Sequence, residues 1–257
     1  SGVNATSQIV AIKKFIETNE MQKTIFLTPK VDYDQEIKKA IKKSKIKISK
    51  HYIYDTEPTK LTKQIEKITN YKIRKQNVLD EIKRIENSDM SDDEKERKIK
   101  RWEKRYTLGK LNFDSVIISD FDESLKSVIT SLLYTDVLPE NNYIITFNQW
   151  FDESLLVEKS IQPIYYPSIN KKNLEAFEKK FQSQFSEKPN HLALLSYDLI
   201  GLVYYLSIKN DSTEFNKLFK KKNSFKGKIG IFDVQDNKIN HRLNFYQIKK
   251  GKLKEIF

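Results

Sequence analysis

The sequence predicts an α/β protein in which helices cover both faces of a parallel sheet. Short apolar runs alternate along the chain with amphipathic helical stretches, the order that strand-helix-strand units produce. The runs 24–27, 115–119 and 143–147 are apolar almost throughout, as strands buried on both faces are. We therefore expect a three-layer sandwich with the sheet as its middle layer.

The first part of the chain continues this alternation. Apolar residues at helical spacing predict successive helices that carry Ile9, Ile12, Phe15 and Ile16; Ile37, Ala40 and Ile41; Leu61, Ile65 and Ile68; and Leu125, Val128, Ile129 and Leu132. The run 24–27 is the first strand, which Pro29 ends, and 46–54 alternates as the second. Strands and helices thus follow one another from the start.

A segment from about Asn70 to Lys110 interrupts the alternation. It contains two apolar stripes at helical spacing, formed by Val78, Ile82 and Ile85 and by Ile99, Trp102 and Tyr106. The polar residues 87–93 between them supply a turn and a helix start. We predict a helical hairpin with outer faces of mixed charge. The hairpin is either a solvent-exposed projection without a binding role or an arm that binds a partner.

The remainder of the chain is helical at first and then rich in strands. A strand over 161–166 is followed by an amphipathic helix with Leu174, Phe177, Phe181 and Phe185. The stretch 192–206 predicts a helix that is apolar almost all round, as helices buried on more than one side are. A β-rich tail starts at 227–232, and Lys250-Gly251 forms a hairpin turn within it.

Composition excludes several classes of protein. The 257 residues, 38% of them hydrophobic, suffice for a real core, and the absence of cysteine excludes disulfides, thiol nucleophiles and cysteine-bound metals. The longest apolar run, 192–206, falls short of the roughly 20 residues that cross a bilayer, so we expect no membrane span. The first residues lack the features of a signal sequence. We expect the natural amino terminus, with any lipid anchor, to lie upstream.

The net charge of +12 raises the question of a nucleic-acid partner, because basic surfaces bind phosphates. The basic residues are mostly lysines interleaved with acids, as on solvated helix faces. We therefore expect no nucleic-acid partner and retain nucleic-acid binding only as the last alternative.

The chain carries no recognisable motif for catalysis, cofactors or metals. His51, His191 and His241 lack metal-ligand spacing, and the glycines form neither a phosphate-binding loop nor a dinucleotide fingerprint. We expect no cofactor and no metal.

Acidic residues follow the end of the strand 115–119. Asp120, Asp122 and Glu123 can serve as a carboxylate pair for acid-base work, or Asp122 can cap the following helix. The nucleophile that such an enzyme needs is not evident, because the Ser196-Tyr197-Asp198 stretch lacks the glycines of a nucleophile elbow. We expect a protein that is not an enzyme.

Several local motifs occur in a fixed order along the chain. They are Tyr33-Asp34 after the first strand, Tyr54-Asp55, Asp114-Ser115-Val116, Asn148-Gln149-Trp150, the Phe177, Phe181, Phe185 and Pro189 helix, and Ser196-Tyr197-Asp198. This ordered set resembles the second half of type I periplasmic-binding proteins, the fold of branched-chain amino acid receptors. The hairpin between Thr69-Asn70-Tyr71 and Phe113-Asp114 is similar to that of bacterial penicillin-binding protein activators, which are outer-membrane lipoproteins related to solute receptors.

The resemblance implies half of a two-lobed protein that lacks the first half of its first lobe. It assigns 1–160 and 226–257 to the second lobe, with 70–110 inserted as the hairpin, and 161–225 to the first lobe. The apolar helix 192–206 would then be bare, and we expect a homodimer to cover it. It also implies a periplasmic location.

In the parent fold, residues at strand ends face a ligand cleft between the lobes. Here these residues are Tyr33, Asp34, Asp120, Phe121, Asn148 and Trp150. Structural roles are the alternative, since Tyr33 can cover a sheet edge, Phe121 can belong to the core and Trp150 can start a helix.

The function that the resemblance implies is non-catalytic binding of a ligand or a partner. An activator would bind a cell-wall synthesis protein. The alternative is the substrate-binding component of an amino-acid ABC transporter, whose ligand is amino-acid-like.

Overall fold

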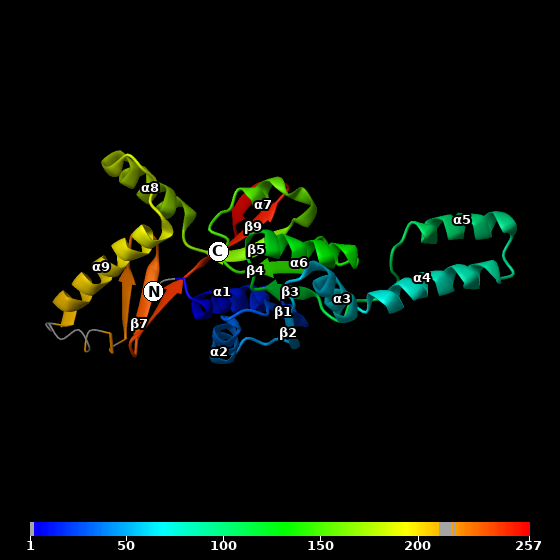
Figure 1. Ribbon diagram of the computed structural model, residues 1–257, viewed down its shortest axis with the longest axis horizontal. Coiled ribbons are helices and arrows are strands. Elements are labelled where there is room, and N and C mark those ends of the chain that lie inside the picture. Colours follow the sequence, from blue (N-terminus) through cyan, green and yellow to red (C-terminus); the bar gives the residue numbers. More distant parts are fainter. Residues whose placement is uncertain (1–2, 211–216, 218, 221) are drawn as a thin grey trace.

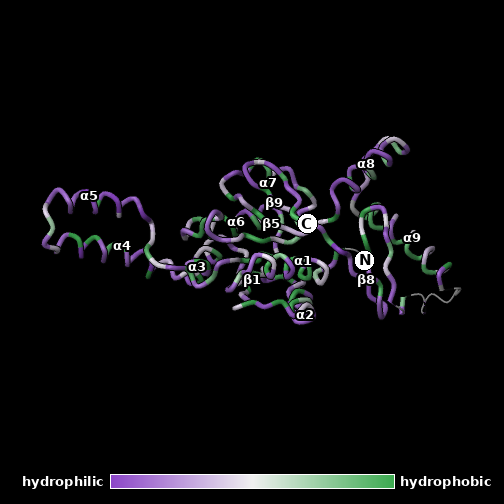
Figure 2. The backbone as a smooth tube through the Cα atoms, turned by 180° about the vertical axis from the view of Figure 1, so that it is seen from behind, coloured by the Kyte–Doolittle hydropathy of each residue, from purple (hydrophilic) through white to green (hydrophobic). Residues whose placement is uncertain are grey.

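The computed structural model describes residues 3–210, 217, 219–220 and 222–257. It contains a large α/β unit, a smaller α/β unit and a helical hairpin that projects from the large unit (Figure 1). Figure 2 shows the strands at the centre of the large unit as mainly hydrophobic and the hairpin as mainly hydrophilic.

The large unit has a seven-stranded sheet in the order β10-β9-β5-β4-β3-β1-β2. The strands are β1 (Thr24–Pro29), β2 (Lys50–Tyr54), β3 (Ser115–Ile118), β4 (Tyr143–Thr146), β5 (Ile164–Ser168), β9 (Asn244–Lys249) and β10 (Lys252–Glu255). Strands β2, β1, β3, β4 and β5 are parallel, whereas β9 and β10 each run antiparallel to their neighbours. The predicted α/β class with a parallel sheet is confirmed.

Helices cover both faces of this sheet. They are α1 (Ala5–Thr18), α2 (Asp34–Ser44), α3 (Pro58–Ile68), α6 (Asp122–Tyr134), the short α7 (Ser154–Val157) and the 3-10 helix η1 (Lys159–Ile161). Side chains alternate between the faces, so Ile25 and Leu27 pack towards α3 and α6, and Phe26 packs towards α1 and α2. The sheet is therefore the middle layer of a three-layer sandwich, as predicted.

Helix α1 joins the two ends of the chain. Its N-cap Asn4 donates a hydrogen bond from Nδ2 to the Ile239 carbonyl (2.9 Å), and Ser7 Oγ accepts one from the His241 amide (2.9 Å). The ring of Phe15, buried in the core, stacks on Phe245 with centroids 4.4 Å apart. The start of the chain is thus packed against residues more than 230 positions away.

The predicted hairpin is formed by α4 (Tyr71–Glu86) and α5 (Asp92–Glu103). Val78 and Ile85 of α4 are buried, whereas Tyr106, which we expected in the second stripe, is 76% exposed. The hairpin precedes β3, so it leaves the sheet at the amino ends of the parallel strands, opposite their carboxyl ends (Figure 1).

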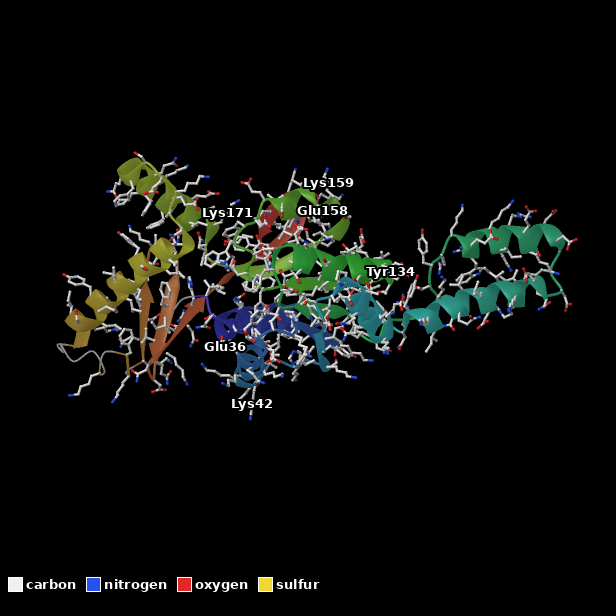
Figure 3. The ribbon with its side chains drawn as sticks, in the orientation of Figure 1. Glu36, Lys42, Tyr134, Glu158, Lys159 and Lys171 are labelled. Carbon is white, nitrogen blue, oxygen red and sulfur yellow. The ribbon has the colours of Figure 1, made fainter. Side chains whose placement is uncertain are left out.

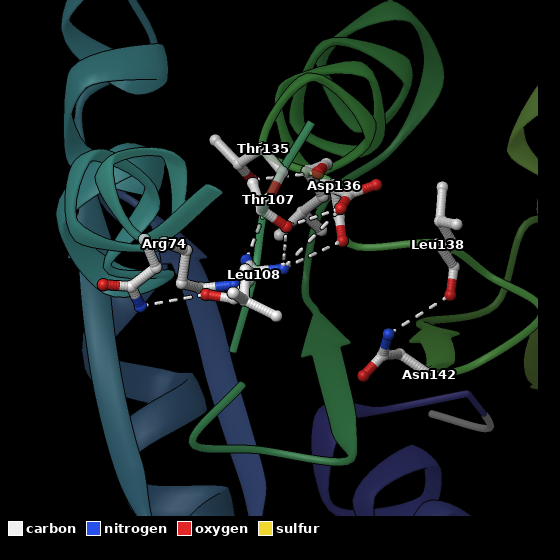
Figure 4. A network of polar contacts seen from close by, with 9 residues as sticks. Arg74, Thr107, Leu108, Thr135, Asp136, Leu138 and Asn142 are labelled. Atoms are coloured by element: carbon white, nitrogen blue, oxygen red, sulfur yellow. Dashed lines mark hydrogen bonds and ion pairs between the residues drawn. The ribbon is translucent and has the colours of Figure 1, made fainter. Parts of the chain in front are cut away.

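Arg74 fixes the base of the hairpin to the large unit (Figure 4). Its guanidinium donates to the Thr135 carbonyl (3.2 Å) and to Thr107 Oγ1 (2.7 Å), and it pairs with the Asp136 carboxylate at 3.8 Å. The Arg74 carbonyl accepts from the Leu108 amide (2.8 Å). The base is therefore held by a buried polar network as well as by the chain itself.

Arg74→Ala is expected to lower the free energy of unfolding by about 2 kcal/mol, because it leaves buried acceptors without their donor. Arg84→Ala on the same helix is the matched control, since the Arg84 side chain is 76% exposed and pairs with Glu81 at the surface. Urea unfolding followed by circular dichroism measures both variants. Equal midpoints for the two variants would contradict a stabilising role of this network.

The smaller unit consists of α8 (Lys171–Phe185), α9 (His191–Asn210) and the antiparallel sheet β6-β7-β8. The strands are β6 (Asn223–Lys226), β7 (Ile231–Gln235) and β8 (Lys238–Arg242). Leu202 and Leu206 of α9 are buried with Val234 of β7. Strands β7 and β8 lie within the range 226–257 that the sequence assigned to the second lobe, yet they pair with β6 and not with the large sheet. The lobe to which each part belongs stays a prediction.

Helix α9 is long and apolar enough to cross a membrane by length and composition, with a mean hydropathy of 1.4 over Leu192–Lys209. The run 192–206 was expected to be too short for such a segment, whereas the helix extends over His191–Asn210 and meets this test of length and composition. Only 22% of that window is buried. Leu199, which we expected to be bare, is 37% exposed, and Val203 is half-buried. The helix packs on its own sheet through one side and presents apolar side chains on the other.

Candidate functional site

The candidate site lies where the parallel strands of the large sheet end. Tyr33 and Asp34 follow β1, Asp120 and Phe121 follow β3, and Asn148 and Trp150 follow β4. Because parallel strands share their carboxyl edge, all six residues lie at that edge, where open α/β sheets bind ligands. From the same edge β5 leads into α8, so the edge faces the smaller unit (Figure 1).

Asp120 is the centre of a buried hydrogen-bond network. Asp120 is buried, with 6% of its surface exposed. Its carboxylate accepts hydrogen bonds from the Tyr54 hydroxyl, from Ser124 Oγ (2.6 Å) and from the backbone N–H of Phe121 (2.9 Å). The side-chain amide of Gln149 donates from Nε2 to the backbone carbonyl of Asp120 (3.1 Å). Burial and the bond to Asp120 raise the pKa of Tyr54, so this hydroxyl stays protonated and keeps donating. The carboxylate thus ties β2, β3 and α6 together.

The predicted acidic cluster does not form a carboxylate pair with Asp120. Asp122 is the first residue of α6 rather than its N-cap, which is Phe121. Glu123 pairs with Lys126 at the surface (2.7 Å). Asp122 and Glu123 are therefore residues of the first turn of α6, and Glu123 pairs at its surface.

Tyr33 lies close enough to Asp120 to feel its charge, whereas Asp34 pairs within its own helix. The Tyr33 hydroxyl donates to the Ser119 carbonyl (3.2 Å), and burial together with the nearby Asp120 charge raises the pKa of Tyr33 to about 12. Asp34 pairs with Lys38 of its own helix at 2.9 Å. The structure thus brings Tyr33 and Asp120 together and turns Asp34 towards α2.

Asn148 is buried at the end of β4, with 1% of its surface exposed. The side-chain oxygen Oδ1 accepts from Ser168 Oγ (2.7 Å) and from the backbone N–H of Trp150 (3.0 Å). The backbone N–H of Asn148 donates to Gln8 Oε1 (2.7 Å). Its Nδ2 has no hydrogen-bond partner among the residues that the structure describes. Asn148 therefore joins β4, β5 and α1 and retains one unused donor.

The three aromatic residues of the predicted site are partly buried. Tyr33, Phe121 and Trp150 all pack against the core cluster between the sheet and α1. All three thus contribute to packing, and Trp150 in addition lines a pocket of about 260 Å³.

Sequence reasoning missed the other side chains of that pocket. Tyr166 of β5 and Lys171 and Glu178 of α8 also line it. Tyr166 was visible only as part of the expected strand 161–166, and nothing in the local sequence indicates that α8 packs across the strand ends.

His51 accepts or donates one hydrogen bond, to Thr28 Oγ1 (2.8 Å), and burial and Lys38 lower the pKa of this histidine. Over the described ranges of the chain, no group of three His, Cys, Asp or Glu side chains is arranged to hold a metal ion.

Neither a protein-family model nor a curated protein matches the sequence. Solved structures do match. Full-length LpoA from Haemophilus influenzae superposes with a TM-score of 0.58 at 12% identity, over 100% of this chain and 40% of LpoA. The LpoA C-domain, described as a regulator of PBP1A, gives the same score and identity over 68% of its length.

A periplasmic ligand-binding protein of a branched-chain amino acid ABC transporter from Burkholderia xenovorans LB400 gives a TM-score of 0.62 at 10% identity. The match covers 99% of this chain and 63% of that protein. The chain thus spans less than half of full-length LpoA and about two thirds of the transporter protein. Its sandwich, strand order and match to both kinds of protein give the chain the fold of the type I periplasmic-binding proteins.

Proposed function

We propose that this chain is a non-catalytic, periplasmic binding component that regulates cell-wall synthesis by binding a penicillin-binding protein. The observation that carries the proposal is that the predicted charged groups at the carboxyl edge of the large sheet already have partners within the chain. The Asp120 carboxylate has three internal donors, and Asp34 has Lys38. A site for a zwitterionic amino acid needs charged or polar groups that remain free for the ligand. The two carboxylates predicted for the ligand site, Asp34 and Asp120, are therefore already engaged, which favours a protein partner over a zwitterionic amino acid.

The hairpin supports the same proposal, because it projects from the large unit and exposes apolar side chains (Figure 1). Exposed apolar side chains, Ile73 (64%) and Leu79 (47%), lie on α4. Arg74 holds the base of the hairpin in one orientation. Apolar side chains on a rigid, charged projection are typical of surfaces that bind other proteins. The description of the LpoA C-domain as a regulator of PBP1A supplies the class of partner.

Binding of the 257-residue chain to a purified penicillin-binding protein with glycosyltransferase and transpeptidase domains tests this function. We expect saturable binding by surface plasmon resonance and at least a tenfold loss of affinity in the double variant Ile73→Ser, Leu79→Ser. Ile53→Ser, at a site on β2 that is 38% exposed, is the control and should bind normally. No binding, or equal loss in the control, would refute the proposal.

The second candidate is the substrate-binding component of an amino-acid ABC transporter. The unused Nδ2 of Asn148 and the pocket beside Trp150 favour it, because they provide a donor and a cavity at the edge where ligands of this fold class bind. Calorimetry with neutral branched-chain amino acids separates the two candidates. Tight, saturable binding of leucine without binding of the penicillin-binding protein favours transport.

A further inference from the structure

A pocket of about 260 Å³ lies where α8 meets the large unit. It is lined from one side by Trp150, Phe151 and Tyr166 and from α8 by Lys171, Leu174 and Glu178. Figure 3 labels Lys171 at the start of α8, where this helix leaves the large unit. The volume equals roughly nine water molecules at ~30 Å³ each, which suits a small organic molecule.

The hydroxyl of Tyr166 has no assigned role in the fold. Tyr166 is 0% exposed, and its hydroxyl has no hydrogen-bond partner among the described residues. Burial, with smaller effects of Tyr246 and Asp152, raises the pKa of Tyr166, so the hydroxyl is protonated at neutral pH. Buried hydroxyls are normally paired, because an unpaired one loses the hydrogen bonds it makes in water. A ligand in the pocket would restore that partner.

The charge of the pocket is opposite to that of the chain. Four carboxylates line it, Asp152, Glu153, Glu175 and Glu178, against the two ammonium groups of Lys171 and Lys188. The formal charge of the lining is thus −4 + 2 = −2, in a chain of net charge +12. Lys171 lies 3.8 Å from Glu175, whereas Glu153 and Glu178 form no ion pair within the part of the chain that the structure describes. Two carboxylates remain for a cation.

The aromatic wall is suited to a cation as well. The Phe151 ring meets the rings of Tyr246 and Tyr166 edge-on, with centroids 5.1 Å and 6.3 Å apart. Lys171 Nζ already lies 5.7 Å from the Phe151 centroid. Ring faces attract ammonium groups within about 6 Å. This wall would therefore stabilise a second ammonium group that enters the pocket.

We propose that this pocket binds a small ligand with a primary ammonium group on an aliphatic stem. The ammonium group donates to Tyr166 Oη and to the carboxylate of Glu178, and the stem packs on Leu174. The Tyr166 hydroxyl accepts one ammonium hydrogen, which gives the buried oxygen the partner that it lacks. The site is independent of the hairpin, so it goes beyond the regulatory function proposed above.

Isothermal titration of the 257-residue chain with 1,5-diaminopentane tests the site. We expect saturable 1:1 binding that weakens as salt is raised, and no binding of glutarate, which also has five carbons but carries the opposite charge. Tyr166→Phe and Glu178→Gln should each lower the affinity by about tenfold, as the loss of a hydrogen bond to a charged group does. Glu36→Gln on α2, which removes an exposed carboxylate elsewhere, should leave it unchanged.

A second readout separates ligand binding from a structural role of Tyr166. Because its hydroxyl has no partner among the residues that the structure describes, Tyr166→Phe should leave the melting temperature of the free protein unchanged or raise it. A lowered melting temperature would show that the hydroxyl already has a structural partner and would overturn the proposal. So would absence of diaminopentane binding, or equal affinities in the wild type and both pocket variants. None of these outcomes depends on whether a penicillin-binding protein binds.

Discussion

Asp198→Ala is expected to lower the free energy of unfolding by about 3 kcal/mol. Asp198 of α9 is 2% exposed, and its carboxylate accepts hydrogen bonds from the amides of Lys228 (2.7 Å) and Ile229 (2.9 Å). Alanine leaves both amides without an acceptor and opens a cavity between α9 and the β6-β7 turn. The loss should affect the whole smaller unit, because these bonds connect its helix to its sheet.

Urea unfolding measures this effect, and two further variants sharpen it. Asp198→Asn keeps one acceptor oxygen and should fall between the wild type and alanine. Asp233→Ala, on β7, is the control, because the Asp233 side chain is 40% exposed and pairs with Arg242 at the surface. A loss in Asp198→Ala no larger than that in Asp233→Ala would contradict the structural role of Asp198.

Acidification from pH 7 to pH 4 is expected to destabilise the chain by about 3 kcal/mol through His241 alone. This residue is 3% exposed, its ring stacks on Phe232 at 4.4 Å, and burial lowers its pKa from 6.5 to about 4. The unfolded chain binds a proton near pH 6.5, whereas the folded chain resists protonation until about pH 4. The stabilisation is therefore complete above pH 6.5 and is lost as the pH falls towards 4.

The variant His241→Phe isolates this contribution, because phenylalanine keeps an aromatic ring at the position and does not titrate. Unfolding free energies at pH 7 and pH 4.5 should differ less in the variant than in the wild type. His51, whose pKa is also lowered, is present in both proteins and cancels in the comparison. Parallel pH profiles of the two proteins would show that His241 is accessible to protons in the folded state.

The core of the sheet could be predicted from sequence because its strands are buried on both faces. Strands β1, β3 and β4 coincide with the predicted apolar runs to within two residues. Their order along the chain also places Asp120 and Asn148 at one edge. A strand buried on both faces is apolar at nearly every position. Such strands and their ends can therefore be predicted without knowing which distant residues pack against them.

The partners of the site residues could not be predicted, because they depend on contacts across the chain. Asp34 was predicted to face the cleft, and its i,i+4 pair with Lys38 was not foreseen. Tyr54 reaches Asp120 across 66 positions, a pairing that no local pattern encodes. Likewise, the alternation of apolar and polar residues in β7 and β8 predicts strands, but it does not indicate which sheet these strands join.

The joining of both chain ends through α1 has a kinetic consequence. The bonds from Asn4 and Ser7 to β8 close loops of 235 and 234 residues. Closing such a loop costs about 3 kcal/mol more entropy than closing a ten-residue turn, and this cost falls on the folding barrier. Helix α1 can form early and pack on α2 and β1, yet the part of its apolar face around Phe15 stays open to solvent until β8 and β9 arrive. The slowest step of refolding should therefore be the docking of this helix, and aggregation during refolding should begin on its exposed face.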